Sequence, residues 1–151
     1  MKNSLNRRHL MRAGLSATAI TLLPMPVFAT SEKMQNAIEA MFGDADIAQE
    51  KVSLSIPPIA ENGYSVPLSV GVKTPMIESN YIKRIAIFSE RNPIALIADF
   101  QLTPYSGQAF VSTRIRLGGT QAITAIAETS NGKLYSGQAK ALVTLAACVI
   151  L

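Results

Sequence analysis

Cysteine, histidine and tryptophan are nearly absent from this chain of 151 residues, which has one cysteine, one histidine and no tryptophan. The only histidine, His9, lies in an N-terminal segment that we expect to be cleaved. A serine–histidine–aspartate triad, or a zinc site of histidine and cysteine, is therefore excluded from the mature chain. The 10 acidic residues show no paired spacing that would indicate acid–base catalysis. This inventory favours a protein that is not an enzyme, or one that enzymes act upon.

Paired arginines near the N-terminus predict an export signal. Arg7 and Arg8 precede an uncharged, mainly apolar stretch, Ala13–Phe28, which closes on Ala29. This order is typical of a bacterial signal peptide of the twin-arginine route. A membrane anchor is the alternative, but the apolar core is about 11 residues long, whereas a spanning helix needs roughly 20. We expect a signal peptide over residues 1–29, cleavage after Ala29, and a periplasmic protein without a stable membrane anchor.

The net positive charge of the chain also belongs to this segment. The formal net charge is +4, and the basic residues of the signal are Lys2, Arg7, Arg8 and Arg12. Without them the acidic and basic residues balance. A neutral mature protein argues against a nucleic-acid partner bound through bulk charge.

Residues 30–145 have the sequence pattern of one small β domain. Apolar residues at helical spacing predict a short helix over Ser31–Phe42. Beyond it, alternating polarity with turn signals roughly every 8–12 residues predicts about seven short strands in an all-β antiparallel sandwich. The expected strands are Val52–Ile56, Val66–Val72, Tyr81–Phe88, Ile94–Leu102, Ala109–Leu117, Gln121–Thr129 and Ala139–Leu145.

Two short signals refine this prediction. Asn131-Gly132 is a strong hairpin signal between the last two strands. Pro67 lacks a backbone donor, so it predicts that Val66–Val72 is an edge strand.

The single cysteine, Cys148, is the fourth residue from the C-terminus, and three interpretations of it compete. It could be the lipidated cysteine of a C-a-a-X box, but that modification belongs to proteins exposed to eukaryotic cytosolic enzymes and conflicts with a bacterial export signal. It could be a buried structural thiol. It could also be a reactive thiol, as a lone cysteine in an exported protein suggests.

Several short segments occur in a fixed order along the domain. They are Asn92-Pro93, Ala98-Asp99-Phe100, Ser106-Gly107, Val111–Leu117, Thr120-Gln121 and Asn131-Gly132. Together with the twin-arginine signal and the near-terminal cysteine, they resemble the SoxY family, the sulfur-carrier subunits of the periplasmic thiosulfate-oxidising system.

The resemblance implies an immunoglobulin-like sandwich that forms a heterodimer with a second small β protein, SoxZ. It implies that sulfur intermediates are held covalently on a cysteine of a C-terminal arm, and Cys148 matches that cysteine by position. Sulfur-oxidising enzymes of the Sox type would load thiosulfate, oxidise the bound sulfane sulfur and hydrolyse off sulfate. The carrier itself would then be no enzyme and would need no cofactor.

The expected arm, residues 146–151, departs from the Gly-Gly-Cys-Gly-Gly ending of typical SoxY chains. Here Ala146 and Ala147 precede the cysteine, and Val149, Ile150 and Leu151 follow it, as in SoxY-related proteins with an Ala-Ala-Cys arm. Alanine restricts the backbone freedom that glycine allows, and large apolar side chains resist exposure to water. We therefore expect the arm to have a docked resting position.

Other interpretations remain open at this point. The chain could be a periplasmic protein-binding module in which Cys148 is incidental, or an enzyme that acts through carboxylates. Arg114 and Arg116 share one strand face, which is either simply solvated or pairs with carboxylates of a partner subunit. Asn92 and Asp99 belong to the resemblance, but the sequence assigns them no chemistry.

Overall fold

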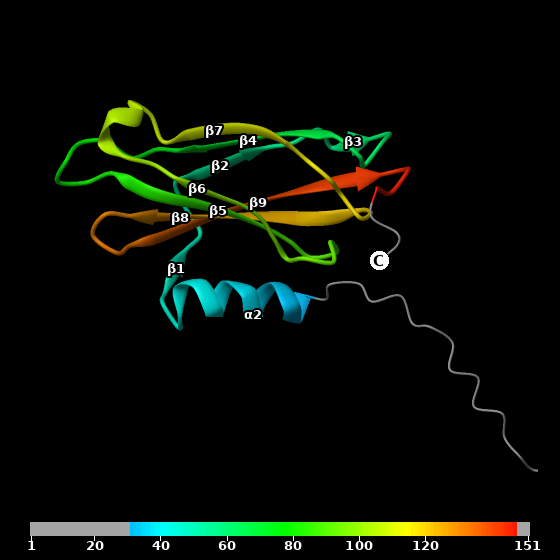
Figure 1. Cartoon of the computed structure of the whole chain (residues 1–151), viewed down its shortest axis with the longest axis horizontal. Helices are drawn as coiled ribbons and strands as arrows, with labels where there is room; N and C mark the ends of the chain where they lie inside the picture. Colours follow the sequence, from blue (N-terminus) through cyan, green and yellow to red (C-terminus); the bar gives the residue numbers. More distant parts are fainter. Residues whose placement is uncertain (1–30, 148–151) are drawn as a thin grey trace, which may run out of the picture.

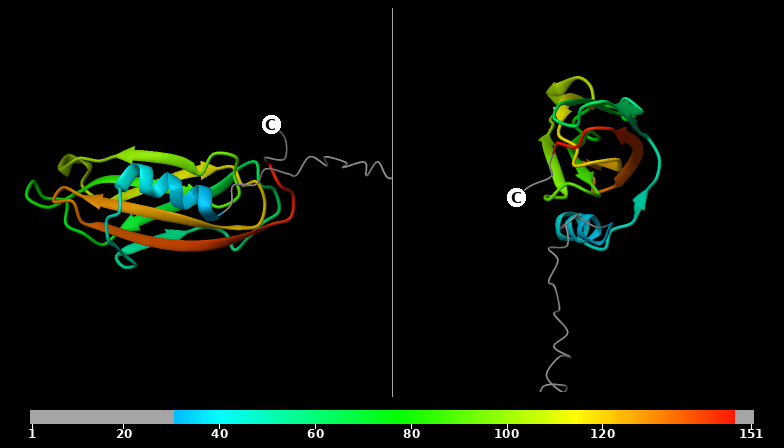
Figure 2. Two further views of the ribbon diagram at one scale, coloured as in Figure 1. Left: turned by 90° about the horizontal axis from the view of Figure 1, so that it is seen from below. Right: turned by 90° about the vertical axis from the view of Figure 1, so that its right-hand side faces the viewer.

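A computed structural model describes residues 31–147 as two β-sheets packed face to face, with a helix on the outer side of the larger sheet (Figure 1). The helix, α2 (Ser31–Phe42), has the predicted bounds. Seen end-on in Figure 2, the two sheets enclose the core and α2 forms a third layer. Within the described residues, no helix combines the length and apolar character that crossing a bilayer requires.

The larger sheet is six-stranded, in the order β1-β9-β8-β5-β6, with β3 beside β9. Its strands are β1 (Ile47–Ala48), β3 (Ile59–Ala60), β5 (Ile82–Ser89), β6 (Leu96–Gln101), β8 (Gln121–Thr129) and β9 (Leu134–Val143). Neighbours among β9, β8, β5 and β6 are antiparallel, whereas β1 and β3 each pair with β9 in parallel.

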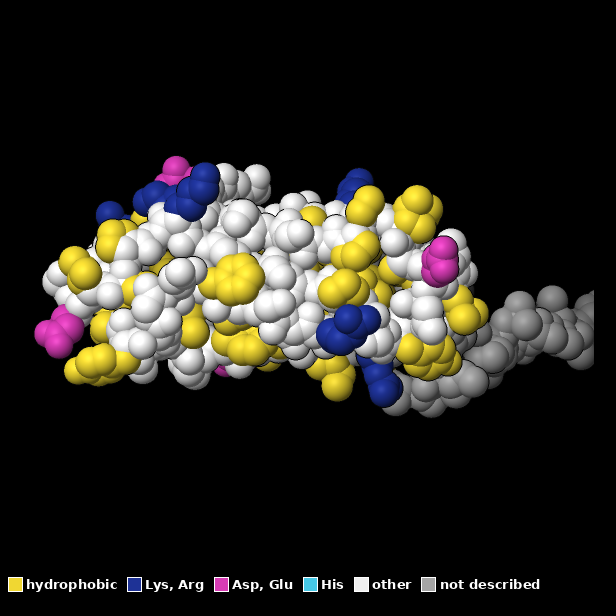
Figure 3. Space-filling view, turned by 90° about the horizontal axis from the view of Figure 1, so that it is seen from above, with side chains coloured by type: hydrophobic (Ala, Val, Ile, Leu, Met, Phe, Trp, Pro, Cys, Tyr) yellow, Lys and Arg dark blue, Asp and Glu magenta, His cyan; other side chains and the backbone are white. Residues whose placement is uncertain are grey.

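The smaller sheet has three antiparallel strands in the order β2-β4-β7. They are β2 (Val52–Ser55), β4 (Val66–Val72) and β7 (Phe110–Ile115), and a short 3-10 helix, η1 (Pro104–Ser106), connects β6 to β7. The outer face of this sheet consists largely of uncharged side chains, as Figure 3 shows.

Alternating residues of the two sheets form the main core between them. Leu68 and Val70 of β4 face Ile85 and Ile87 of β5 and Ile123 of β8, and none of these five side chains is more than 1% exposed. Full burial of such a side chain stabilises a fold by about 1.5–3 kcal/mol. The period-two pattern of the sequence therefore identifies the strands that build the core.

A second apolar cluster lies under α2. Phe88 of β5 and Ile126 of β8 point to the outer face of the larger sheet and pack against helix residues that include Met34. The rings of Phe42 and Phe88 meet edge to face, with centroids 6.4 Å apart. Because β5 and β8 are covered on both faces, their sequences are almost continuously apolar rather than alternating.

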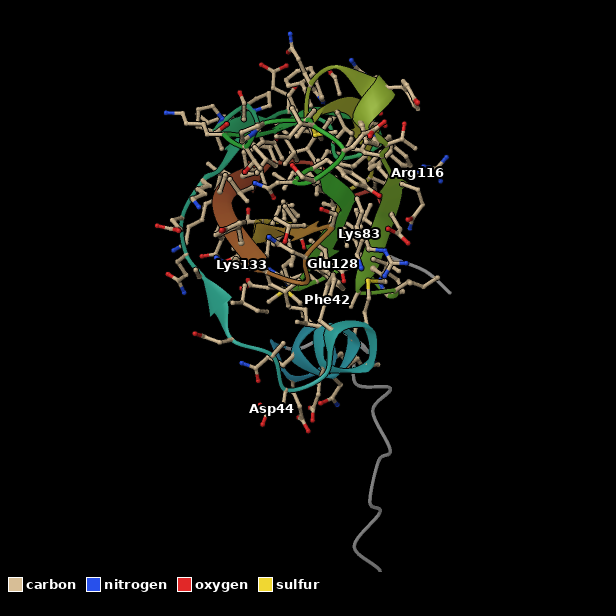
Figure 4. The ribbon with its side chains drawn as sticks, turned by 90° about the vertical axis from the view of Figure 1, so that its left-hand side faces the viewer. Phe42, Asp44, Lys83, Arg116, Glu128 and Lys133 are labelled. Carbon is tan, nitrogen blue, oxygen red and sulfur yellow. The ribbon has the colours of Figure 1, made fainter. Side chains whose placement is uncertain are left out.

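Beyond the helix, charged residues cover the outer face of the larger sheet. Figure 4 shows Lys83 and Glu128 beside Phe42, and their side chains form an ion pair of 2.7 Å. Next to them, Arg84 pairs with Asp99 of β6 at 3.3 Å. Asp99, which the sequence left without a role, is therefore part of a surface ion-pair cluster on the sheet.

The predicted all-β sandwich with a short N-terminal helix is confirmed, with differences in detail. Nine strands occur among residues 31–147 rather than about seven, since β1 and β3 are two-residue strands. The hairpin at Asn131-Gly132 joins β8 to β9, and Gly132 has a φ of +84°. The last predicted strand, Ala139–Leu145, was placed too late, because β9 already begins at Leu134.

The surroundings of Gly137 and Pro67 explain why the sequence misplaced the start of β9 and the position of β4 in its sheet. Gly137 weakens the strand signal of β9, but a Cβ there would overlap the carbonyl oxygen of Val52, so only glycine fits. The edge-strand prediction for β4 was wrong, since β4 is the central strand of its sheet. Pro67 is tolerated because β2 pairs with β4 only as far as Ser69, which leaves β4 locally unpaired on one side.

Replacing Gly137 by alanine should destabilise the sandwich. The added methyl group would meet the Val52 backbone, so β2 or β9 must shift, and we expect the free energy of unfolding to fall by about 1–3 kcal/mol. Denaturant unfolding measures the loss. Gly71→Ala is the matched control in β4, because its methyl group would meet only side-chain atoms, the nearest at 3.2 Å. Equal effects of the two substitutions would contradict this account.

Candidate functional site

The end of β9 and the residues that follow it run alongside β3 and the residues on either side of β3. The N–H of Leu142 donates a hydrogen bond to the carbonyl oxygen of Pro58 at 2.8 Å, and that of Thr144 donates to Ala60 at 3.1 Å. The hydroxyl of Thr144 donates to the carbonyl oxygen of Glu61 at 2.8 Å. The end of the described chain is therefore bonded along the surface of the sandwich, not projected from it.

The last described residue, Ala147, is also bonded to the sandwich. Its N–H donates to the carbonyl oxygen of Leu117 at 3.0 Å, and the N–H of Leu117 donates to the carbonyl oxygen of Gly63 at 2.8 Å. The N–H of Gly63 completes the set by donating to the carbonyl oxygen of Leu145, also at 2.8 Å. We call this arrangement of Gly63, Leu117, Leu145 and Ala147 the backbone clamp.

Gly63 is required at the centre of the clamp for reasons of space. A Cβ on Gly63 would lie 2.5 Å from the Leu117 carbonyl oxygen and 3.1 Å from both the Ala147 nitrogen and the Leu145 carbonyl oxygen. Contacts this close to main-chain atoms would force the backbone to shift. Glycine thus allows three chain segments to approach more closely than any residue with a side chain would permit.

A buried polar network holds the loop that carries Leu117. The side-chain amide of Asn92 donates to the carbonyl oxygen of Arg116 at 2.8 Å, and its oxygen accepts from the N–H of Gly118 at 2.8 Å. The same oxygen accepts from the side-chain amide of Gln121 at 3.2 Å. Asn92 therefore bonds the backbone on both sides of Leu117, which gives this residue the structural role that the sequence did not reveal.

Ser89 and Gln121 extend this network into the core. Ser89 is fully buried, and its hydroxyl donates to the side-chain oxygen of Gln121 and accepts from the N–H of Asn92 at 3.0 Å. Asn92 and Gln121 are 8% and 5% exposed. A buried polar group without a partner costs about 1–3 kcal/mol. The network is therefore a strong constraint on the position of the Leu117 loop.

The structure describes only part of the predicted arm. Ala146 and Ala147 are half-buried and belong to the bonded end of the sandwich. Cys148, Val149, Ile150 and Leu151 lie outside the described residues, as do Arg7, Arg8 and Ala29 of the predicted signal. The described part of the site therefore consists of the groups that hold Ala147, the residue immediately before the cysteine.

Lys51, a described residue whose pKa is shifted, lies away from this site. The pKa of Lys51 is raised above its ordinary value, mainly because its ammonium group donates a hydrogen bond of 2.9 Å to the hydroxyl of Tyr135. Tyr135 lies near the start of β9, whereas the cysteine follows the end of that strand. Residues 31–147 contain no group of three or more metal-binding side chains.

Comparison with known proteins identifies the family. The model of the family described as sulfur oxidation protein SoxY matches residues 38–148, well over half of the chain. This chain belongs to the SoxY family. The matched region ends at Cys148, so it includes both the backbone clamp and the cysteine that follows it.

Solved structures agree with this assignment. The sulfur carrier protein SoxY from Chlorobium limicola f thiosulfatophilum is 30% identical, with a TM-score of 0.65 over 77% of this chain and 100% of that chain. Family membership and this similarity support a sulfur-carrier role in sulfur oxidation. A comparison with curated protein sequences found no match.

The fold also resembles that of superoxide reductases. The superoxide reductase (neelaredoxin) from Ignicoccus hospitalis is 15% identical, with a TM-score of 0.55 over 77% of this chain and 94% of that chain. The superoxide reductase from Nanoarchaeum equitans is 17% identical, with a TM-score of 0.52 over 63% and 99%. At this level of identity the similarity shows the sandwich architecture alone.

Replacing Gly63 by alanine should detach the C-terminal segment of this SoxY-family chain. The added methyl group would overlap the Leu117 carbonyl oxygen and crowd the Ala147 nitrogen, which are backbone atoms without freedom to rotate away. We expect the Ala147 amide hydrogen to exchange with solvent at least about tenfold faster, as measured by NMR.

Gly71→Ala is again the matched control and should leave exchange at Ala147 unchanged. Amides in the middle of β8 should keep their protection in both variants. Unchanged exchange at Ala147 in the Gly63 variant would show that the clamp does not hold this residue.

Proposed function

We propose that this SoxY-family chain carries a sulfur intermediate covalently on Cys148 and presents it to partner enzymes. The observation that carries the proposal is the position of this cysteine, at the end of the matched family region and directly after the clamped Ala147. Ala147, the residue that precedes this thiol, is hydrogen-bonded to the sandwich. A partner that binds this end of the sandwich would therefore meet the thiol at a defined place.

The proposed loading step is a two-electron oxidation. The thiolate sulfur of Cys148 and the terminal sulfur of thiosulfate form an S–S bond, and the two electrons released pass to a haem-containing partner. The product is a thiosulfonate with one negative charge. In a later step a second partner adds water to the sulfonate sulfur of this thiosulfonate. Sulfate and two protons leave, and a persulfide anion stays on Cys148.

We further propose that the chain acts as a carrier and not as the catalyst of these steps. The described groups that bond Leu145 and Ala147 in the clamp are backbone amides and carbonyls rather than acids, bases or cations. The thiol would therefore be activated within the partner's site, where a metal or haem cofactor is also supplied.

The clamp shortens the reach of the proposed arm. Six extended residues from Ala146 would span about 20 Å, whereas the four residues beyond Ala147 span about 14 Å at most. A partner must therefore accept the end of the sandwich together with the cysteine, or the hydrogen bonds of Leu145 and Ala147 must break first.

We propose a periplasmic location, reached by the twin-arginine route. Its support is the order of residues in the predicted signal, with Arg7 and Arg8 before the apolar stretch and Ala29 at its end. The thiosulfate-oxidising partners would then be found in the same compartment.

We also propose that a SoxZ-like subunit binds the outer face of the smaller sheet. Arg114 is exposed there, and its guanidinium donates to the hydroxyl of Ser65 at 2.6 Å and to the Ser65 carbonyl oxygen at 2.8 Å. Arg116 is exposed and points away from the sandwich in Figure 4. Between the strands, the hydroxyls of Ser69 and Ser112 lie 3.1 Å apart. Such a largely uncharged face with two cations suits a partner that presents carboxylates.

The carrier proposal is tested by intact mass spectrometry of the protein isolated from cells exposed to thiosulfate. We expect sulfur-containing adducts that map to Cys148 and disappear on reduction. Cys148→Ser should carry none and should abolish thiosulfate oxidation in the cell, because the thiolate is the attachment atom. Thermal unfolding of the variant serves as the control for folding.

Two outcomes would favour other functions. If Cys148→Ser keeps full activity in the cell, the chain is a protein-binding module in which the thiol is incidental. If the purified protein alone turns over substrate and survives loss of Cys148, an enzyme acting through carboxylates replaces the carrier.

The partner surface is tested by charge reversal. Arg114→Glu with Arg116→Glu should weaken binding of a SoxZ-like subunit by about tenfold or more, because like charges would then face each other. Isothermal titration calorimetry measures the dissociation constant. Lys33→Glu, an exposed reversal on α2, is the control and should leave affinity unchanged. Equal affinity of all variants would place the subunit elsewhere.

A further inference from the structure

The helix α2 covers only part of the outer face of the larger sheet. Leu134 packs beneath the helix, whereas Leu142, on the same face of β9 and eight residues later, is 49% exposed. The 12 residues of the helix extend about 18 Å, whereas eight strand residues extend about 26 Å. In Figure 1, α2 accordingly stops short of the end of the sandwich where β9 finishes. The sheet face at that end is not covered by the helix.

A mainly apolar pocket of about 490 Å³ opens on this uncovered face. Its lining includes Pro58 before β3, Glu90 after β5, Ala122 of β8, and Lys140 and Leu142 of β9. Ala122 and Lys140 are register partners, so they lie side by side on the sheet. The single methyl group of Ala122 leaves room that a larger side chain would occupy. We call this space the Leu142 pocket.

Apolar surface continues outside the Leu142 pocket. Ile59 is the register partner of Leu142 in the β3–β9 pair, and its side chain is 58% exposed. Register partners project from the same face of a sheet, so the two side chains form one apolar rim. Apolar surface gathered in one place on a soluble protein commonly marks a contact site. The pocket and its rim therefore fit an apolar side chain of another protein.

Two charged residues of opposite sign border the pocket. Lys140 is exposed, and among residues 31–147 it takes part in no ion pair. On another wall, the carboxylate of Glu90 accepts a hydrogen bond of 3.3 Å from the N–H of Ala122, which holds it beside the pocket. A complementary partner presents a carboxylate to Lys140 and a cation to Glu90. The pocket thus specifies both the apolar side chain and the charges around it.

The pocket lies at the end of the sandwich that carries the backbone clamp. Leu142 is five residues before Ala147, so their Cα atoms are at most about 18 Å apart. A specific interface covers about 800 Å² of each partner, which corresponds to a patch roughly 30 Å across. A protein that binds over Ala147 is therefore large enough to cover the Leu142 pocket as well.

One partner in the proposed function has a particular need for such a surface. The haem-containing partner that loads thiosulfate meets the carrier while its thiol is still free. No adduct marks the protein at that stage, and the clamp consists of backbone groups. Recognition of the carrier must then come from the side chains on its surface.

We propose that the Leu142 pocket is the docking site of this haem-containing partner. An apolar side chain of the partner fills the pocket, a carboxylate beside it meets Lys140, and a cation meets Glu90. The identity of the partner rests on the proposed function, whereas the chemistry of the pocket does not.

The docking site is tested by the rate of adduct formation on the full-length carrier. The purified haem-containing partner, thiosulfate and oxidised cytochrome c are mixed with increasing amounts of carrier, and intact mass spectrometry follows the adduct. Leu142→Ser, Lys140→Glu and the pocket-filling Ala122→Met should each raise the KM for the carrier about tenfold and leave kcat unchanged. This is the pattern of a contact that is made equally in the bound state and in the transition state.

Matched controls lie at the opposite end of the sandwich. Ile77→Ser removes an apolar side chain that is 55% exposed, and Lys73→Glu reverses an exposed charge. Both residues belong to the connection from β4 to β5 (Figure 1), and both variants should keep the wild-type KM. Lys140→Arg, which keeps the cation, should keep it as well. Thermal unfolding checks that each variant is folded, and Ile59→Ser replaces any pocket variant that is not.

A second measurement detects docking without the chemistry. In isothermal titration calorimetry, the partner should bind Cys148→Ser about tenfold more tightly than Cys148→Ser combined with Leu142→Ser. Equal affinity would overturn the proposal, as would an unchanged KM in the three pocket variants or their weaker binding of a SoxZ-like subunit. Absence of an adduct on the wild type, with docking intact, would instead overturn the proposed function alone.

Discussion

The backbone clamp is the constraint on which the proposed function of this SoxY-family chain depends. Three segments that are distant in sequence meet at Gly63, Leu117 and Ala147, and they are joined by main-chain hydrogen bonds of 2.8–3.0 Å. The contact exists only because Gly63 has no side chain. It fixes the residue before Cys148, so the thiol would leave the sandwich from a defined point rather than from the end of a long free arm.

The clamp is supported by buried polar groups as well as by the apolar core, to which the fully buried side chain of Leu117 belongs. Asn92, Ser89 and Gln121 hold the loop that carries Leu117, and every one of their bonds replaces water that the burial excludes. The core between the sheets stabilises the fold as a whole. The polar network in addition gives the Leu117 loop a defined position, as the proposed presentation of a thiol requires.

The sequence by itself determined the helix at Ser31–Phe42 and the all-β architecture, because local periodicity carries that information. Residue counts also identified Cys148 as the single thiol of the chain. The sequence pattern misplaced the start of β9 and wrongly predicted β4 as an edge strand. Gly137 and Pro67 caused these errors, because the reason each is tolerated lies in neighbours that are distant in the chain. Likewise, only the tertiary structure gave Asn92 and Gly63 their roles. Their partners, Arg116, Leu117 and Ala147, lie far from them in sequence, and no local pattern records which backbone groups meet when the sheets close.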